Sequence, residues 1–251
     1  MSDAREAGGS RLGVVLSGLV VAIGCVLFLG GFAWGAVLYK PYSVPTDSMS
    51  PTIGKGDRVL AERIDGGEVR RGDVVVFQDE IWGALPMVKR VIGVGGDKVV
   101  CCDKQNRLTV DGKVLEEPYL QAKEPASMTR FSTTVPKGSL FLMGDHRSDS
   151  LDSRVHLTDS SRGAVPTDAV TARVDATAWP LGAFGMMGRP EVFEKLPGGV
   201  SQPGPLRLVS VSVLTGAVLI LGGAAYGPVA RRMGGGTTRR DETREKVAAS
   251  G

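Results

Sequence analysis

Two uncharged apolar stretches near the ends of the chain constrain its fold more than any other feature. Residues 12–39 and residues 208–230 contain no Asp, Glu, Lys or Arg. A helix needs about 20 consecutive apolar residues to cross the hydrocarbon core of a bilayer, and each stretch is long enough. The sequence therefore predicts two transmembrane helices with one long segment between them.

Each apolar stretch also has a second interpretation. The first could be a cleaved signal peptide, and residues 22–25, Ala-Ile-Gly-Cys, loosely resemble a lipoprotein cleavage site. The apolar part of a signal peptide spans only about 7–15 residues, however, whereas this stretch continues well beyond Cys25. The second could be a buried core helix, but it is apolar all round and ends against Arg231-Arg232, which favours a bilayer. We expect two uncleaved spans.

The charge of the C-terminal tail predicts how these helices are oriented. Short basic segments stay cytoplasmic, whereas long loops cross the membrane largely regardless of charge. We therefore expect a two-span protein of the cell membrane, with both termini cytoplasmic and residues 40–207 outside. The chain carries a net charge of +3 at pH 7, and its basic excess in the tail is better explained by anionic lipid than by nucleic acid. The basic residues of the tail are Arg231, Arg232, Arg239, Arg240, Arg244 and Lys246.

The long segment between the predicted spans has the pattern of a β domain. Short runs rich in β-branched residues alternate with glycine-containing turns, and no stretch has the pattern of a soluble amphipathic helix. The predicted fold is mainly β: an antiparallel, partly closed barrel or sandwich, with an inserted subdomain at about residues 103–138. An Asp-Gly pair at residues 111–112 predicts a tight hairpin turn. The predicted strands are residues 58–61, 73–77, 88–92, 97–100, 108–110 and 140–143.

This pattern divides the chain into six consecutive parts. Cys101 and Cys102 are adjacent within the β domain; they either close a strained disulfide ring or, on a strand, point to opposite faces. The sequence leaves that choice open and assigns these residues no metal. The parts are an N-terminal tail (1–11), a transmembrane helix (12–39), the β domain (40–189), a Gly/Pro-rich linker (190–207), a second transmembrane helix (208–230) and the basic tail (231–251).

Two residues in the β domain could carry chemistry together. Ser48 follows the first apolar stretch closely and lies between Pro45 and Pro51, which stiffen the backbone on both sides. Lys89 lies within a valine-rich run, and burial would lower its pKa enough for a neutral amine to act as a base. Each has a plainer interpretation: an ordinary Ser-Pro turn, and a lysine that faces solvent. The chain has only two histidines, so a Ser-His-Asp triad has few candidates.

A third polar segment, residues 144–154, follows a strand that we expect to be buried. Asp152 and Arg154 are two positions apart, so an extended chain would direct them to the same side. The hydroxyl of Ser150 could orient a nearby amine. The same segment could instead be a solvated turn or a calcium loop, but calcium loops need more carboxylates at regular spacing. We therefore expect neither a metal nor another cofactor.

These segments together resemble the type I signal peptidases, membrane-bound serine–lysine proteases that cleave secretory leader peptides. The family's Ser-x-Ser-Met-x-Pro-Thr is matched by Thr-Asp-Ser-Met-Ser-Pro-Thr at residues 46–52. Its Arg-Gly-Asp-x-Val-x-Phe and Lys-Arg-x-x-Gly-x-x-Gly-Asp signatures occur at residues 71–77 and 89–97. Its Gly-Asp-Asn-x-x-x-Ser-x-Asp-Ser-Arg corresponds to residues 144–154. All four occur in the family's order, over about residues 40–180.

The resemblance implies a role for each matching residue. Ser48 would be the nucleophile and Lys89 its neutral general base. The oxyanion hole would consist of the Ser48 backbone N–H and the hydroxyl of Thr46, which replaces the family's serine and adds a methyl group. His146 replaces the usual asparagine, which removes no catalytic group. The supporting residues would be Ser150, which positions the amine, with Asp145, Asp152 and Arg154, which brace the site.

The resemblance also implies the substrates, namely secretory preproteins with small residues at the first and third positions before the cut, typically Ala-x-Ala. A second span resembles some actinobacterial members more than the single-anchored Gram-positive ones. Two rivals remain at this point. Self-cleaving repressors of the DNA-damage response use a similar pair but are soluble, and an inactive membrane-tethered scaffold would not need both Ser48 and Lys89.

Overall fold

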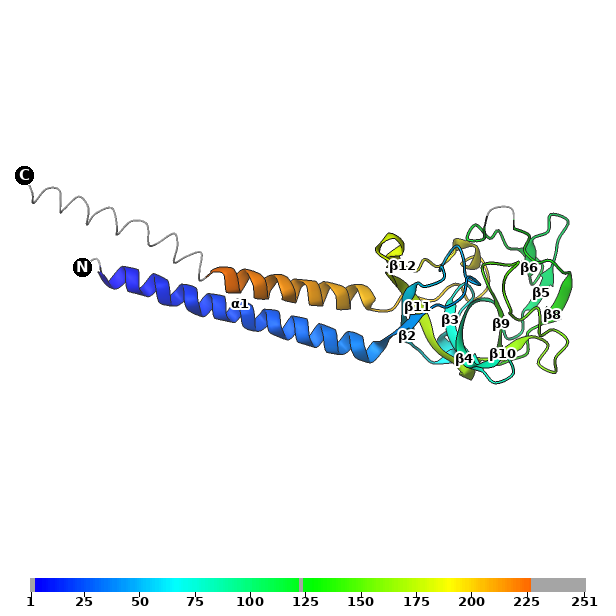
Figure 1. Ribbon diagram of the computed structural model, residues 1–251, viewed down its shortest axis with the longest axis horizontal. Coiled ribbons are helices and arrows are strands. Elements are labelled where there is room, and N and C mark those ends of the chain that lie inside the picture. Colours follow the sequence, from blue (N-terminus) through cyan, green and yellow to red (C-terminus); the bar gives the residue numbers. More distant parts are fainter. Residues whose placement is uncertain (1–2, 122–123, 227–251) are drawn as a thin grey trace, which may run out of the picture. The chain divides into compact units, whose positions relative to one another are not determined.

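The computed structural model of the chain describes residues 3–121 and 124–226 (Figure 1). Its contacts divide the chain into two units. The β unit is Leu38–Gly204, and the helical unit is Met1–Val37 with Pro205–Gly251. The predicted basic tail, and the end of the second predicted span at residues 227–230, lie outside the described residues.

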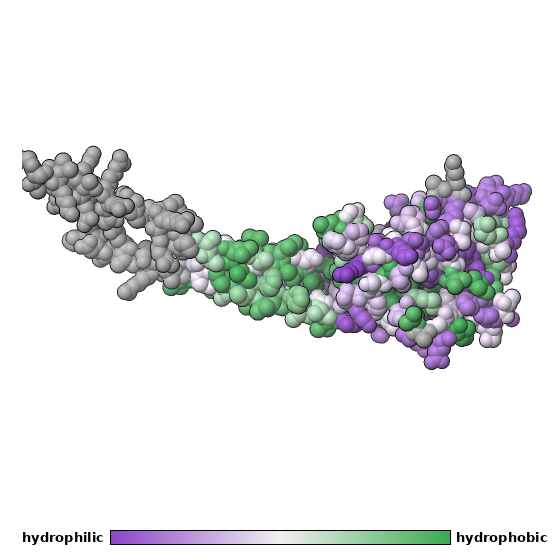
Figure 2. Space-filling view, viewed as in Figure 1, coloured by the Kyte–Doolittle hydropathy of each residue, from purple (hydrophilic) through white to green (hydrophobic). Residues whose placement is uncertain are grey.

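Two helices form the described part of the helical unit. They are α1, Asp3–Leu38, and a second helix over Leu206–Tyr226. Both are long and apolar enough to cross a membrane, and few of their residues are buried. A helix in a soluble core would bury most of its large apolar side chains, whereas Phe32 and Leu221 are exposed and the visible surface of these helices is mostly apolar (Figure 2). These helices fit a membrane-anchored protein.

Small residues let the two helices lie close together. Ser17 Oγ donates to the Gly223 carbonyl at 2.7 Å, and Ser212 Oγ donates to the Leu27 carbonyl at 3.0 Å. A Cβ atom at Gly24 would lie 2.9 Å from a backbone carbonyl of the second helix, so only glycine fits at this contact. Close contacts between small residues and hydroxyl–carbonyl hydrogen bonds are what hold helices together in a bilayer.

The larger sheet of the β unit has eight strands, all paired antiparallel. Their order is β1-β2-β11-β3-β4-β9-β10, and β12 pairs with β11. This order is an open path, so closure into a barrel stays a prediction. The strands are β1 Tyr39–Ser43, β2 Arg58–Arg63, β3 Val74–Asp79, β4 Gly83–Val94, β9 Ser139–Met143, β10 Ala164–Pro166, β11 Val170–Trp179 and β12 Gly185–Met186.

The smaller sheet has four antiparallel strands in the order β7-β6-β5-β8. Asp111 and Gly112 both have positive φ, 52° and 76°, and they join β6 to β7. This is the backbone that a two-residue type I′ turn requires, so the predicted hairpin is confirmed. Cys101, at the end of β5, is joined to Cys102 by a disulfide. The strands are β5 Lys98–Cys101, β6 Leu108–Val110, β7 Lys113–Val114 and β8 Phe131–Thr134.

Strand β11 is central to the larger sheet, and the sequence analysis did not predict it. Residues 170–177 alternate strictly between apolar and polar, a strand pattern that the sequence analysis passed over; the polar Arg173 and Asp175 are buried as well. Glu62 on β2 and Arg189 beyond β12 form ion pairs with them, which makes these charges tolerable inside the unit. The remaining helices of the β unit are single 3₁₀ turns: η1 Gly66–Glu68, η2 Thr167–Ala169, η3 Leu181–Ala183 and η4 Glu191–Phe193.

One of the apolar clusters in the β unit positions the segment that carries Ser48. Met49 and Ile53, which follow Ser48 between β1 and β2, are fully buried. They pack with valines and alanines of β2, β3 and β11, such as Val59 and Val174. Burying two such side chains contributes roughly 1.5–3 kcal/mol each, so this segment is held to the sheet rather than free in solvent.

Candidate active site

Ser48 lies in a segment whose two ends meet at the sheet. The Val44 amide donates to the Asp57 carbonyl at 2.9 Å, and the Gly56 amide donates to the Val44 carbonyl at 2.8 Å. The Lys55 amide donates to Asp47 Oδ1 at 3.0 Å. Together with the buried Met49 and Ile53, these hydrogen bonds fix the backbone on both sides of Ser48, which is only 8% exposed.

Lys89 on β4 lies beside Ser48. Its Nζ is 2.7 Å from Ser48 Oγ, and the residue is only 5% exposed. Burial lowers the pKa of Lys89 below its ordinary value, and the neighbouring Asp152 and Arg154 act on it in opposite directions. Within the described residues no carboxylate forms an ion pair with this amine. A buried amine without a paired charge is the kind that loses its proton most readily.

Thr46 and the segment after β9 complete the surroundings of Ser48. Thr46 Oγ1 lies 3.3 Å from Ser48 Oγ. On the other side, Gly144 packs so closely against the Ser48 carbonyl and Ser150 that a Cβ atom would collide with both. The His146 amide donates to the same Ser48 carbonyl at 3.1 Å. Ser48 therefore rests on the backbone of residues 144–146.

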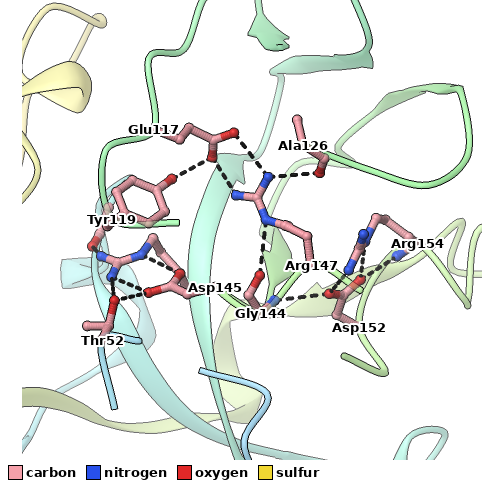
Figure 3. Close-up of polar contacts among 11 residues, drawn as sticks. Thr52, Glu117, Tyr119, Ala126, Gly144, Asp145, Arg147, Asp152 and Arg154 are labelled. Carbon is pink, nitrogen blue, oxygen red and sulfur yellow. Dashed lines mark hydrogen bonds and ion pairs between the residues drawn. The ribbon is translucent and has the colours of Figure 1, made fainter. Parts of the chain in front are cut away.

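Two of the predicted supporting residues, Asp152 and Arg154, form a pair behind this backbone. Arg154 donates to the Asp152 carboxylate from Nε at 2.8 Å and from Nη2 at 2.7 Å. The same carboxylate accepts the Gly144 amide at 3.0 Å. Burial tends to raise the pKa of Asp152, but the hydrogen bonds from Arg154 lower it below its ordinary value. The carboxylate therefore stays ionised and holds Gly144 in place (Figure 3).

The other two predicted supporting residues differ in their contacts. Asp145 accepts Nε and Nη2 of Arg90 at 2.8 and 2.6 Å and the Thr52 hydroxyl at 2.5 Å. The Ser150 hydroxyl is buried beside Gly144, and it is one of the groups that lower the pKa of Asp152. Its role in orienting the Lys89 amine therefore stays a prediction.

Ser48 and Lys89 lie on the wall of a cleft of about 550 Å³. Most of the cleft wall is apolar, which suits a substrate segment with small or apolar side chains. Across residues 3–121 and 124–226, no group of three or more His, Cys, Asp or Glu is placed to hold a metal ion. The cleft is lined by Tyr42, Ser43, Val44, Pro45, Thr46, Ser48, Val76, Trp82, Gly83, Leu85, Pro86, Met87, Val88 and Lys89.

The sequence analysis missed a buried polar network next to this site. Arg90 ion-pairs with Asp145, and Arg147 ion-pairs with Glu117 (Figure 3). One signal was available, because strand alternation directs Arg90 to the face opposite Lys89 and a buried arginine needs a carboxylate. No comparable signal marked Glu117, which lies outside the four matched motifs.

An antiparallel β unit with a serine hydroxyl against a buried amine, at the wall of an apolar cleft, has the components of a serine endopeptidase. The family model described as signal peptidase, peptidase S26, matches residues 15–179. The chain therefore belongs to this family, as a bacterial type I signal peptidase. It is an enzyme, a serine endopeptidase that removes signal peptides.

Individual relatives agree with the family model. Signal peptidase IB of Staphylococcus aureus strain MRSA252 is 33% identical over 184 residues, which cover 66% of this chain and 91% of that protein. The probable signal peptidase I of Mycobacterium leprae strain TN is 30% identical over 227 residues, covering 67% and 76%. A solved structure of a signal peptidase I from Enterococcus faecalis V583 is 27% identical, covers 41% of this chain and 94% of its own, and has a TM-score of 0.34.

Proposed function

We propose that this chain is a membrane-bound endopeptidase that removes N-terminal signal peptides from secretory preproteins, with Ser48 as nucleophile and Lys89 as general base. One observation carries the proposal: the buried Lys89 amine lies 2.7 Å from Ser48 Oγ. That distance is within the range required for direct proton transfer between a nucleophile and its base.

Proton transfer accounts for both halves of the reaction. Lys89 takes the proton from Ser48 Oγ as the oxygen attacks the scissile carbonyl, and the protonated amine then donates it to the leaving nitrogen. The signal peptide is left as an ester on Ser48. Water attacks the ester, Lys89 accepts its proton, and that proton returns to Ser48 Oγ when the ester bond breaks.

The oxyanion formed at each step needs hydrogen-bond donors. We assign this role to the Ser48 backbone N–H and the Thr46 hydroxyl, whose Oγ1 is 3.3 Å from Ser48 Oγ. Donors preorganised toward a developing oxyanion each contribute about 10²–10³-fold to kcat. Asp145, Asp152 and Arg154 would hold the backbone beneath Ser48, and Ser150 would guide the amine.

The substrate side of the proposal is supported by the apolar cleft and by the helices. Small residues before the cut, as in Ala-x-Ala, suit an apolar cleft that has Ser48 on its wall. Membrane lipid would hold enzyme and preprotein in the same plane, which raises their effective concentration. We place the β unit outside the cell membrane and both termini in the cytoplasm, as the basic tail indicates.

We also propose that the larger sheet closes partly into a barrel and that the smaller sheet is an inserted subdomain. The insertion is supported by chain order, because β4 and β9 pair directly although β5, β6, β7 and β8 lie between them in sequence. The insertion would thus leave the paired strands that carry Lys89 and the segment of Asp145 undisturbed.

Cleavage of a model preprotein in detergent tests the function. We expect Ser48→Ala and Lys89→Ala to lower turnover by at least about 10⁴-fold, since each removes one member of a unit that acts together. Lys98→Ala, which removes an exposed lysine on the smaller sheet, is the matched control and should cleave as the wild type does. Substantial turnover by purified Ser48→Ala or Lys89→Ala would reject the pair.

A further inference from the structure

We propose that Glu117 is a positioning residue of the Ser48–Lys89 site: its carboxylate, shared by Arg147 and Tyr119, holds both ends of residues 48–52 in place. The inference rests on the proposed function, because it concerns the geometry of the same nucleophile. Glu117 lies between β7 and β8, in a region that the sequence analysis treated only as an insertion.

The first route from Glu117 reaches Ser48 through Arg147. Arg147 donates from Nη1 to Glu117 Oε2 at 3.0 Å and from Nη2 to Glu117 Oε1. From Nε it donates to the Gly144 carbonyl at 3.0 Å. Gly144 packs against the Ser48 carbonyl, which also accepts the His146 amide. Arg147 thus holds the Gly144 carbonyl (Figure 3), and with it the backbone on which Ser48 rests.

The second route from Glu117 reaches Thr52, at the other end of the same segment. The Tyr119 hydroxyl donates to Glu117 Oε1 at 2.6 Å. The Tyr119 ring lies against the guanidinium of Arg90, with Cζ 4.3 Å from the ring centroid, in a cation–π contact. Arg90 holds Asp145, and Asp145 accepts the Thr52 hydroxyl.

The burial of this network makes Glu117 more than a surface partner. The side chains of Glu117 and Arg147 are 4% and 0% exposed. A guanidinium in such a place is tolerated only when a carboxylate and further hydrogen bonds compensate it. Arg147 has those partners in Glu117 and in the carbonyls of Gly144 and Ala126. Loss of the Glu117 charge would therefore release Arg147 from its place.

The protonation states of Tyr119 and Arg147 favour their hydrogen bonds to Glu117. Burial, aided by the neighbouring Glu117 charge, raises the pKa of Tyr119 well above its ordinary value, so its hydroxyl keeps the proton that it donates. Burial alone would lower the pKa of Arg147, but Glu117 raises it above its ordinary value, so the guanidinium stays charged. Both donors to Glu117 therefore keep the protons that they donate.

For the reaction, Glu117 would affect where Ser48 lies relative to Lys89. Glu117 does not touch Ser48, Lys89 or the cleft, so its effect must pass through the backbone of residues 144–146 and through Thr52. A displacement of about 1 Å at a reacting atom costs on the order of 100-fold in rate. If Ser48 moves away from Lys89 and water enters, the amine is less desolvated and its pKa rises toward that of free lysine.

The test compares purified wild type, Glu117→Gln, Tyr119→Phe and the matched control Glu62→Gln, all in detergent. Glu62 is also the partner of a buried arginine, Arg173, and is itself half-buried, but it lies on β2 outside the network. For Glu117→Gln we expect kcat to fall by about 10-fold to 100-fold, with KM changed by less than about 3-fold. The apparent pKa in the pH profile of kcat/KM should move to higher pH.

Tyr119→Phe keeps the ring against Arg90 and removes one hydroxyl, so it should fold even if Glu117→Gln does not. It should shift kcat and the pH profile in the same direction by a smaller amount, and Glu62→Gln should shift neither. Wild-type kcat and pH profile in the folded network variants would overturn the positioning role, as would an equal loss in Glu62→Gln. Activity retained by Ser48→Ala, measured alongside, would instead overturn the proposed function itself.

Discussion

The two faces of strand β4 place neighbouring basic side chains in opposite surroundings, one with a carboxylate partner and one without. Lys89 and Arg90 are adjacent and both buried, at 5% and 1% exposed. Arg90 is clamped by the Asp145 carboxylate and by the Gly72 carbonyl, whereas Lys89 has the neutral hydroxyl of Ser48 as its hydrogen-bond partner. Paired burial keeps a cation charged, and unpaired burial favours its neutral form. One face therefore supplies structure, and in the proposed mechanism the other supplies a base.

The largest effect is expected when the side chain at position 89 is replaced by a cation that cannot lose its proton. Lys89→Arg should lower kcat/KM by at least about 10⁴-fold, because a guanidinium stays charged at any working pH. Lys89→Met should be equally inactive. Steady-state cleavage of a preprotein measures both variants.

Thermal unfolding of the same two proteins separates chemistry from folding. Lys89→Met should unfold at the wild-type temperature or above it, because it removes a buried amine that is costly to charge, and the Ser48 hydroxyl keeps Thr46 Oγ1 within 3.3 Å. A Lys89→Arg protein that cleaves preprotein near the wild-type rate would contradict the assignment of Lys89 as base.

The Arg90 face is tested by removing its carboxylate. Asp145→Asn leaves the Arg90 guanidinium buried without a counter-charge, which should cost about 3–5 kcal/mol in the free energy of unfolding. Denaturant unfolding measures the loss. Asp149→Asn, an exposed aspartate in the same segment, should change stability by less than about 0.5 kcal/mol; a similar loss in both would show that the pair is not responsible.

The smallest expected effect is the dependence of stability and activity on pH. The pKa of Lys89 is lowered by burial, so the folded protein binds fewer protons than the unfolded chain between that pKa and about 10.4. Stability relative to Lys89→Met should therefore rise with pH in this window, by at most about 1.4 kcal/mol per pH unit, and level off above it. At pH values below the lowered pKa of Lys89, the full free-energy cost of burying its charged amine destabilises the folded protein.

Activity should follow the same titration. In the proposed mechanism the neutral amine of Lys89 is the working form, so kcat/KM should increase with pH through an apparent pKa below that of free lysine. Unfolding curves and cleavage rates at a series of pH values measure the two effects together. A wild-type stability that falls relative to that of Lys89→Met as the pH rises would contradict a buried Lys89 with a lowered pKa.

The fold was predictable where local chemistry decides the backbone. The turn at Asp111 and Gly112 follows from residues that tolerate positive φ, and the strand at Leu140 follows from a continuous apolar run. Strand β11 has a local signal too, the apolar–polar alternation of residues 170–177. That pattern predicts Arg173 and Asp175 on a solvent face, and their burial follows only from their partners on β2 and beyond β12. Charge pairing across a sheet is invisible to a local pattern.

In the candidate site, too, some residues could be predicted from the sequence and others could not. Ser48 and Lys89 stand in recognisable motifs, and the structure brings them within hydrogen-bond distance. Glu117 stands in no matched motif, and its importance arises from two partners, Arg147 and Tyr119, that meet it only in the folded unit. Spacing along the chain carries no information on such a meeting.

By itself the sequence determined the two apolar helices, the antiparallel β character of the segment between them, and the residue types that a serine–lysine protease needs. Those properties depend on composition and on short-range periodicity, which are local. The tertiary structure alone decided which charges are paired: Arg90 with Asp145 and Arg147 with Glu117, while Lys89 forms no ion pair among the residues that the structure describes. The physical reason is that desolvation and ion pairing depend on which side chains meet after folding, and β4 places two cations with opposite outcomes side by side.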